Sequence, residues 1–218
     1  MTTAQDARPA MDRMYRWTRH VYDASRKYYL LGRDALIGDI KAQPGEVVCE
    51  AGCGTARNLI LMAKRYPEAK FVGFDASAEM LKTANASVEK AGLKGKIPLE
   101  VALAQDFAPE LFGLGEKFDR IFFSYALSIM DDWQAAADHA LTQLKPGGTL
   151  HVVDFGDQKG LPRWFKWMLG KWLHQFHVRF RPEVKAHFES LAAAGKGALA
   201  YREVARGYAY LVAFRTNG

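Results

Sequence analysis

Three carboxylates and a glycine-rich turn are the residues of this chain whose spacing could build a ligand site. Glu50 ends a short apolar run and precedes the turn Gly52-Cys53-Gly54-Thr55. Such a turn lets a ligand approach bare backbone, and the helix expected after it offers free N–H groups to an anion. Asp75 and Asp106 fall where two later strands are predicted to end. In an open parallel sheet, ligands bind across the carboxyl ends of the strands, so we expect the three carboxylates at one site.

The same residues distinguish between possible ligands. Asp75 lies 21 residues beyond Gly54, where a carboxylate can accept hydrogen bonds from both hydroxyls of a ribose. Asp106 is placed to accept from the exocyclic amine of an adenine. Glu50 would pair with an ammonium group and would repel a pyrophosphate, and the turn lacks the spacing G-x-G-x-x-G. S-adenosylmethionine is therefore favoured over NAD. Taken singly, the turn also fits any tight strand-to-helix connection, and each carboxylate fits a solvated loop.

The predicted cofactor site extends along the ends of the first four strands and under an N-terminal lid. Its expected members are Glu50, Gly52, Cys53, Gly54, Asp75, Ala76, Met80, Gln105, Asp106, Phe107 and Ser124, with Tyr22 from the lid. Cys49 and Cys53 are the only cysteines, and no histidine cluster with metal-ligand spacing accompanies them. The pattern therefore predicts neither a metal site nor a disulfide framework.

The elements that must position these residues alternate strand and helix. Strands are predicted at residues 47–50, 71–74, 99–104, 118–124 and 149–155, and helices at 57–65, 77–91, 133–144 and 181–194, with Ser77 as an N-cap. A hairpin at 199–206 and 208–214, turned at Gly207, closes the sheet. This alternation predicts a doubly wound, Rossmann-like α/β fold with a seven-stranded sheet.

A single domain is predicted for the 218 residues, with four parts in chain order. These are an N-terminal helical lid (1–45, helices at 10–23 and 26–42), a cofactor-binding core (46–156), an amphipathic insertion after the fifth strand (157–181), and a final helix with the β-hairpin (182–218).

Residues 47–155 resemble the class I S-adenosylmethionine-dependent methyltransferases. The resemblance rests on Glu50-Ala51-Gly52-Cys53-Gly54-Thr55, Asp75, Gln105-Asp106, and Leu144-Lys145-Pro146-Gly147-Gly148 before the fifth strand. Ala56 departs from the pattern, since many members have a third glycine there.

A narrower resemblance covers most of the chain. Residues 11–34, with Arg19-His20-x-Tyr22-Asp23 and Arg26-Lys27-Tyr28-Tyr29-Leu30-Leu31-Gly32-Arg33-Asp34, together with residues 52–58, look like the N-methyltransferases of betaine lipids. These enzymes convert diacylglyceryl-homoserine to its N-trimethyl form. The resemblance implies a lipid headgroup substrate; phosphatidylethanolamine and a soluble small-molecule acceptor remain alternatives.

Methyl transfer to an amine requires alignment, exclusion of water and a neutral acceptor nitrogen. Candidates for the catalytic residues follow the fourth and fifth strands: Tyr125, which could orient the amine, and Asp154, which could take its proton. Tyr125 also fits ordinary packing against adenosine. Tyr29, Arg33 and Tyr125 are predicted to contact the substrate. The guanidinium of Arg33 can bind a carboxylate or phosphate through two hydrogen bonds.

Two basic segments flank an acidic middle. Residues 8–41 hold eight Lys/Arg against four Asp/Glu, residues 157–185 seven against two, and residues 42–156 eleven against fifteen. Within the insertion, apolar residues recur at helical spacing with Trp167 as a misfit, and basic residues lie mainly off the stripe: Leu161, Trp164, Phe165, Met168, Leu169, Trp172, Leu173 and Phe176, against Arg163, Lys166, Lys171 and His174.

A basic amphipathic helix rich in tryptophan favours an anionic membrane surface as partner. The alternatives are packing on the core or on a dimer partner, and nucleic acid, which no recognition motif supports. The chain has no run of about 18 apolar residues that could span a bilayer and no apolar signal-peptide core. We therefore expect a cytoplasmic enzyme bound peripherally to membranes through residues 157–181 and 8–41. A non-catalytic cofactor- or nucleic-acid-binding module is the third alternative.

Overall fold

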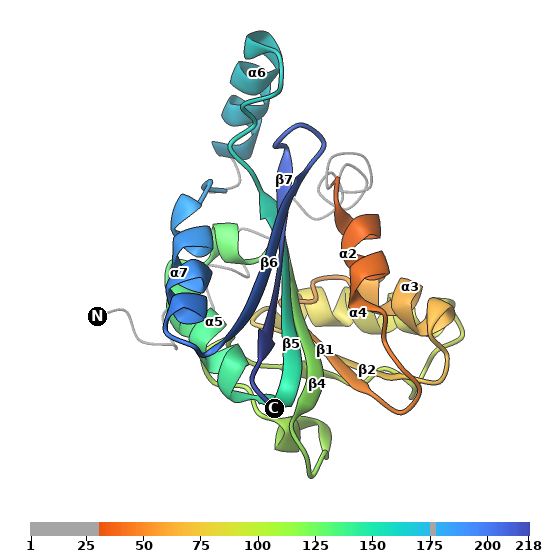
Figure 1. Ribbon diagram of the computed structural model, residues 1–218. Coiled ribbons are helices and arrows are strands. Elements are labelled where there is room, and N and C mark those ends of the chain that lie inside the picture. The colour runs from red at the N-terminus through yellow and green to blue at the C-terminus, as the bar shows by residue number, and fades with distance from the viewer. Residues whose placement is uncertain (1–30, 175–177) are drawn as a thin grey trace.

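The computed structural model describes residues 31–174 and 178–218. They form one seven-stranded sheet in the order β3-β2-β1-β4-β5-β7-β6 (Figure 1). The first five strands are parallel, and β7 runs antiparallel to both β5 and β6. The strands are β1 (Val47–Ala51), β2 (Lys70–Asp75), β3 (Leu99–Val101), β4 (Phe118–Ser124), β5 (Leu144–Phe155), β6 (Gly197–Val204) and β7 (Ala209–Thr216). The expected fold class is confirmed.

Helices cover both faces of the sheet, as a doubly wound fold requires. The helices are α2 (Arg33–Ile40), α3 (Arg57–Arg65), α4 (Ala78–Lys90), α5 (Trp133–Thr142), α6 (Arg163–His174) and α7 (Pro182–Ala193), with short 3₁₀ turns η1 (Pro109–Phe112) and η2 (Leu127–Ile129). One apolar cluster joins α2, α3 and α4 to one face, and a second joins α5 and α7 to the other. Along β4, Phe122 belongs to the first cluster and Ile121 and Phe123 to the second. This strand is central and apolar on both faces, as the sequence predicts.

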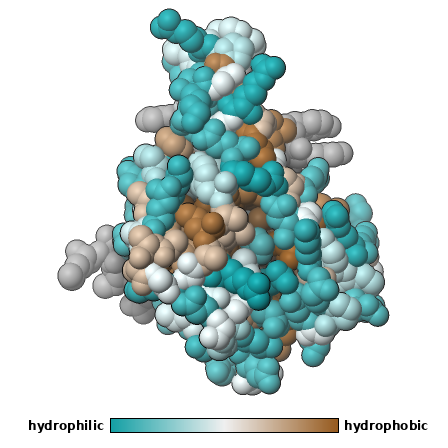
Figure 2. All heavy atoms as spheres, viewed as in Figure 1, coloured by the Kyte–Doolittle hydropathy of each residue, from teal (hydrophilic) through white to brown (hydrophobic). Residues whose placement is uncertain are grey.

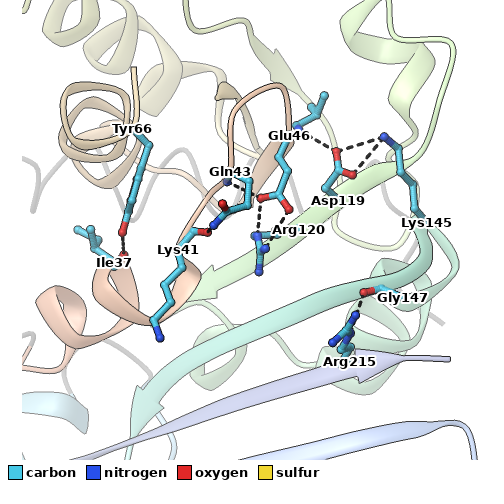
Figure 3. Close-up of polar contacts among 11 residues, drawn as sticks. Ile37, Lys41, Gln43, Glu46, Tyr66, Asp119, Arg120, Lys145, Gly147 and Arg215 are labelled. Carbon is cyan, nitrogen blue, oxygen red and sulfur yellow. Dashed lines mark hydrogen bonds and ion pairs between the residues drawn. The ribbon is translucent and has the colours of Figure 1, made fainter. Parts of the chain in front are cut away.

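The amino ends of β1, β4 and β5 are held together by charged side chains (Figure 3). The Glu46 carboxylate accepts from Arg120 Nε at 2.7 Å and Nη2 at 2.9 Å. Asp119 accepts from the backbone N–H of Val47 at 2.8 Å and from Lys145 Nζ at 3.2 Å. These contacts fix the strand register at the amino ends of the strands. The carboxyl ends, at the opposite edge of the sheet, are left for ligands.

Two predicted strands differ from the structure by more than two residues at one end. The third ends at Val101 rather than at residue 104, because the backbone turns there and Asp106 N–H donates to Leu103 O at 3.1 Å. The fifth begins at Leu144, before the Pro146-Gly147-Gly148 run that was expected to precede it. A register shift between Phe118 and Arg120 of β4 lets the sheet accommodate this run.

Candidate active site

The glycine turn connects the carboxyl end of β1 to α3. Gly52 and Gly54 have φ values of +72° and +55°, in the left-handed region that glycine adopts without strain. The N–H groups of Gly52 and Cys53 both donate to Phe74 O at 2.9 Å, which ties the turn to β2. Ala56 is also left-handed, with φ +59°, and no side chain caps the helix that begins after it. The position of the expected third glycine therefore has a backbone that glycine would favour.

Asp75 joins this turn to the next helix. Its Oδ2 accepts from Gly54 N–H at 2.9 Å, and its Oδ1 accepts from Ser77 N–H at 2.9 Å. Ser77 in turn caps α4, since its side chain accepts from Met80 N–H, as predicted. The structure thus brings Gly54 and Asp75 together across 21 residues. A carboxylate has about four lone-pair sites in all, so its chemistry suits a site for ligand hydroxyls.

Glu50 is buried at the end of β1 and is oriented by a residue that the sequence reasoning did not select. Its Oε1 accepts from Asn58 Nδ2, in the first turn of α3, at 2.6 Å. The other side-chain atom of Asn58, Oδ1, is buried and has no hydrogen-bond partner among the described residues. The sequence does show an asparagine four residues after Gly54, which is the one feature that could have indicated Asn58. Its contact with Glu50 depends on how the turn folds back.

The adenine side of the predicted site is only partly as expected. Gln105 and Asp106 are exposed after β3, where a ligand can reach them. Phe107 instead has no exposed surface, and its ring stacks on Phe74 with centroids 4.4 Å apart. Its side chain is part of the core, so only its backbone can border a ligand. Ala76 is half-buried, and Met80 is buried at the start of α4.

The end of β4 carries two unusual side chains. Ser124 Oγ is buried and has no hydrogen-bond partner within the described part of the chain. Tyr125 has a φ of +56°, a strained conformation for a bulky residue that often marks functional sites. Its hydroxyl donates to Leu31 O, and its ring packs edge-on to Phe155 at 4.7 Å. Burial raises the pKa of Tyr125 well above 10, so the hydroxyl remains protonated.

Asp154, the predicted proton acceptor, is fully engaged in backbone contacts. Its Oδ2 accepts from Ser128 N–H at 2.8 Å, and its Oδ1 accepts from Phe155 N–H at 2.8 Å. Burial raises its pKa to about 6, despite these hydrogen bonds and the nearby charge of Arg181. The geometry makes Asp154 a support for the loop after β4, since both oxygens already hold backbone donors.

The loop after β4, residues 125–132, lies against the glycine turn. A Cβ at Gly52 would come within 3.2 Å of Ala126 Cβ and 3.7 Å of Met130 Cε. The loop is therefore next to the donor end of the predicted site. Its other side is bound by Arg181, which donates to Leu127 O at 3.0 Å and to Met130 O at 2.6 Å. No local sequence pattern predicts this contact, because it joins residues more than 50 positions apart.

Comparison with known proteins decides the family. Residues 42–201 match the family model described as "Methyltransferase domain". The chain belongs to this family.

Two named relatives are enzymes with different acceptors. A demethylmenaquinone methyltransferase of Listeria monocytogenes is 30% identical over 141 residues, which are 64% of this chain and 57% of that protein. A trans-aconitate 2-methyltransferase of Deinococcus radiodurans is 31% identical over 124 residues, 55% of this chain and 43% of that one. This methyltransferase thus spans about half the length of the curated relatives it matches.

Solved structures share the fold at low identity. Magnesium protoporphyrin IX methyltransferase from Synechocystis PCC 6803, solved with bound SAH, has a TM-score of 0.69 at 17% identity and covers 96% of this chain and 99% of that one. An O-methyltransferase family protein from Burkholderia thailandensis has a TM-score of 0.67 at 18% identity, covering 90% and 59%. The fold is that of class I methyltransferases, and S-adenosylmethionine is the cofactor that this family membership implies.

The residues of the methyltransferase fit such a cofactor. Buried polar atoms without a partner among the described residues, Asn58 Oδ1 and Ser124 Oγ, belong to the turn and to β4 at the carboxyl edge of the sheet. Glu50 and Asp75 add two buried carboxylates at the same edge. Cys53 is buried beside β2, and burial raises its thiol pKa, so it contributes as a small neutral side chain.

The predicted substrate residues are only partly within the described chain. Arg33 is half-buried at the start of α2, next to the carbonyl of Leu31 that Tyr125 contacts. The electrostatic influence of Arg33 on Tyr125 places the two side chains near one another. Tyr22 and Tyr29, and the predicted helix at 10–23, lie outside the described residues.

The insertion forms α6, which projects from the body of the molecule beyond the strand ends (Figure 1). Leu169 is buried and Leu161 packs on the core, whereas Trp164 is 67% exposed and Met168 50% exposed. Trp167, the misfit of the predicted stripe, is 65% exposed beside them. The stripe is therefore not simply a core-facing surface. The side chains of Phe165 and of residues 172–177 lie outside the described part of the structure.

Neither a metal-binding cluster nor a membrane-spanning helix occurs among the described residues. No group of three or more His, Cys, Asp or Glu within residues 31–174 and 178–218 could hold a metal ion. No helix in that same part of the chain is long and apolar enough to cross a membrane.

Proposed function

We propose that this methyltransferase transfers methyl groups from S-adenosylmethionine to the amine of a lipid headgroup at an anionic membrane surface, with diacylglyceryl-homoserine as the preferred acceptor. The observation that carries the acceptor proposal is α6. This helix exposes two tryptophans and a methionine, and residues 158–182 contain six Lys/Arg and no Asp/Glu. Exposed tryptophan beside basic residues is the composition of helices that lie in an anionic lipid interface.

The donor half of the reaction belongs to the carboxyl edge of β1, β2 and β4. Glu50 is suited to the ammonium of the amino-acid moiety, Asp75 to ribose hydroxyls, and the exposed Asp106 to the amine of adenine. When bound, S-adenosylmethionine supplies the methyl group together with its own leaving group. The protein then has to orient the two reactants and exclude water.

The acceptor half is assigned to Tyr125, Arg33 and the loop after β4. Tyr125 is a rigid aromatic wall next to Ser124, and Arg33 at the start of α2 can bind the carboxylate of a homoserine headgroup or a phosphate. Asp154 holds the loop through Ser128 and has no oxygen without a backbone donor. We therefore assign removal of the acceptor proton to water, and assign Asp154 the supporting role.

The experiment is a direct search for the acceptor. The protein is incubated with S-adenosylmethionine labelled in the methyl group and with a mixed lipid extract, and the lipids are separated. We expect label in an amine lipid, and faster labelling of added diacylglyceryl-homoserine than of added phosphatidylethanolamine. Asp75→Ala should abolish the labelling. Labelling of phosphatidylethanolamine alone would show that phosphatidylethanolamine, and not diacylglyceryl-homoserine, is the acceptor.

A small-molecule acceptor is the second candidate, and the relatives favour it. They are named as methyltransferases of demethylmenaquinone and trans-aconitate, and one of them is 30% identical to this chain. The same labelled cofactor is therefore offered with a water-soluble quinol, trans-aconitate and a cytosolic extract free of lipid. Label in one of these, with none in any amine lipid, would establish the second candidate and refute the first.

A further inference from the structure

The segment that follows α6 is bonded to the loop beside the methyl-donor turn. Arg179 N–H donates to Ser128 O at 3.1 Å. The guanidinium of Arg181 donates from Nε to Leu127 O and from Nη2 to Met130 O, at 3.0 Å and 2.6 Å. We call residues 179–181 the clasp. Three hydrogen bonds, two of them charge-assisted, connect the clasp to three residues of the loop, Leu127, Ser128 and Met130.

The loop has a second support on its opposite side. Asp154, on β5, accepts from the N–H of Ser128, whose carbonyl the clasp binds. Ser128 is thus fixed through its donor by the sheet and through its acceptor by the clasp. Met130, whose carbonyl accepts from Arg181, also lies close to the glycine turn. Its Cε would be 3.7 Å from a Cβ placed on Gly52. A displacement of the clasp would move the loop at the donor turn.

The clasp is also the return connection of α6. Helix α6 projects from the body (Figure 1), and its Leu169 is buried while Trp164, Trp167 and Met168 are exposed. Only three residues, 175–177, separate the described end of α6 from Val178, which packs on the core before the clasp. The position of the helix and the position of the loop are therefore connected over a very short length of chain.

We propose that Arg181 is a positioning residue that couples α6 to the loop after β4, so that engagement of α6 with an anionic lipid surface fixes the loop for methyl transfer. This proposal rests on the proposed function, because the surface that engages α6 is the one that carries the acceptor. An arginine suits the role: its planar fork binds two carbonyls at once, whereas a lysine would bind one at a time.

The charge of Arg181 gives a second consequence. Burial raises the pKa of Asp154, whereas hydrogen bonds from Ser128 and Phe155 and the charge of Arg181 lower it. Tyr125 and Tyr210 also interact electrostatically with this carboxyl group. The ionised carboxylate accepts two backbone N–H groups, and protonation removes part of that capacity. Arg181→Gln should therefore weaken the loop directly, and should also raise the pKa of Asp154 above about 6.

The test compares wild type, Arg181→Gln, Arg181→Lys and the control Arg202→Gln. Arg202 is paired with Asp39 at 2.6 Å on the outer strand β6, so its loss removes the same charge without touching the loop. For each variant we measure the Kd for S-adenosylmethionine, flotation with vesicles containing phosphatidylglycerol, and kcat and KM on amine lipid in those vesicles. Each protein is used only after its thermal midpoint has been measured.

We expect Arg181→Gln to bind cofactor and vesicles as wild type does but to lose about tenfold in kcat, since misplacement near the reacting atoms lowers the rate and not the binding of the substrate. The acid limb of its kcat profile should move to higher pH. Arg181→Lys should restore the pH profile and only part of kcat. A purely structural role would leave the pH profile unchanged.

Amide hydrogen exchange of residues 125–132 tests the coupling without any acceptor. Vesicles should slow exchange of the Ser128 N–H in wild type and in Arg202→Gln, and should not slow it in Arg181→Gln. Equal kcat and an equal pH profile in Arg181→Gln, or no effect of vesicles on exchange in wild type although it binds them, would overturn the proposal. If the loop responds to vesicles but no lipid accepts label, the proposed function fails while the coupling stands.

Discussion

Single carboxyl groups account for much of what this site can do. Asp75 binds the N–H groups of Gly54 and Ser77, and so connects the glycine turn to α4 through contacts within the protein. A group that is already held in place does not have to be ordered when the cofactor binds, which reduces the entropic cost of binding. We therefore propose that the same carboxylate contributes both to the fold of the site and to its affinity for the cofactor.

Replacing Asp75 by asparagine should separate these two roles. The amide has one accepting oxygen, so either Gly54 or Ser77 loses its acceptor, and the group that we propose to contact the ribose is no longer charged. A hydrogen bond to a charged group is worth about 1.5–3 kcal/mol, so we expect roughly 10- to 100-fold weaker cofactor binding by calorimetry. Asp39→Asn, which removes an exposed carboxylate outside the site, is the control. Unchanged affinity in Asp75→Asn would contradict the assignment.

Asp154 should leave a signature in the pH dependence of stability. Its pKa is about 6 in the folded chain against an ordinary value of 3.8. Because the folded pKa is the higher one, this group stabilises the fold at low pH, and that contribution is lost as the pH rises to about 6. Asp154→Asn does not titrate. Relative to the variant, the wild type should therefore lose about 2 kcal/mol of unfolding free energy between pH 4 and 7. Urea titrations at several pH values measure this, and a pH-independent difference would argue against a raised pKa.

His151 should change the pH dependence of stability in the opposite direction. It is buried on β5 beside Arg120, and burial lowers its pKa from 6.5 to about 4. Its stabilising contribution is complete above pH 6.5 and is lost as the pH falls toward 4. Relative to His151→Gln, the wild type should therefore lose about 3 kcal/mol of unfolding free energy between pH 7 and 4. The same urea titrations test this, and the two variants should diverge with opposite slopes. Parallel slopes would refute both assignments.

At the level of elements, the contact between β2 and α3 determines where the glycine turn lies. Gly73 lies in the middle of β2, and a Cβ there would come within 2.6 Å of Leu59 Cδ1 and 3.0 Å of Cys53 Cβ. Helix α3 and the turn pack directly on the strand backbone. Any side chain at Gly73 has to push both away.

Gly73→Ala should consequently destabilise the protein and displace the turn together. We expect a loss of about 1–3 kcal/mol of unfolding free energy from overpacking, and weaker cofactor binding because Cys53 is in the turn. Gly38→Ala is the matched control: Gly38 lies within α2 and a Cβ there meets nothing within 4 Å. That substitution should instead add about 0.5–1 kcal/mol. Chemical denaturation and calorimetry measure both, and equal effects of the two substitutions would contradict this packing account.

The sequence predicts the elements well where local signals act alone. Helix α3 has the predicted bounds, and Ser77 is the predicted cap of α4, because apolar periodicity and capping are local. The predicted bounds differ by more than two residues at β3 and β5. There, the backbone turn after Val101 and the register shift opposite Phe118 depend on neighbouring strands. The sequence also predicts Phe107 at the ligand. Its burial depends on the stacking of its ring on Phe74, a contact that only the folded chain makes.

Residues that act through other residues were the hardest to find. Glu50 and Asp75 are visible from the sequence because their type and spacing fit a ligand. Asn58 and Arg181 are not, because each binds a partner that only the folded chain brings near. Sequence patterns therefore predict the groups that can touch a cofactor. The residues that orient those groups can be identified only from the structure.

At the level of the whole molecule, the charges are unevenly distributed. The chain carries a net charge of +6, yet residues 42–156, which include most of the proposed cofactor site, contain more acidic than basic residues. The excess of positive charge within the described chain lies around α6, which stands clear of the body and is hydrophilic over most of its visible face (Figure 2). The segment around α6 is thus suited to an anionic surface, whereas residues 42–156 carry a net negative charge.

This asymmetry predicts which lysines control membrane binding. Lys166 and Lys171 are exposed on α6, and Lys171 lies over the ring of Trp167 at 4.2 Å. Replacing both by glutamate should weaken binding to vesicles that contain phosphatidylglycerol by at least roughly 30-fold, because each basic residue near such a surface contributes about 1 kcal/mol. Added salt should reduce the difference by screening. Cofactor affinity should not change, since neither lysine is near the glycine turn.

Lys94→Glu with Lys96→Glu is the matched control for that experiment. Both lysines are exposed between α4 and β3, on the body of the molecule, and the pair changes the net charge by the same amount. If binding depends on net charge alone, the two double variants will dissociate from the vesicles equally, and α6 will have no special role. If α6 is the contact, only the Lys166/Lys171 variant will dissociate. Loss of lipid methylation in that variant, with cofactor binding intact, would then connect the basic end of the molecule to the choice of acceptor.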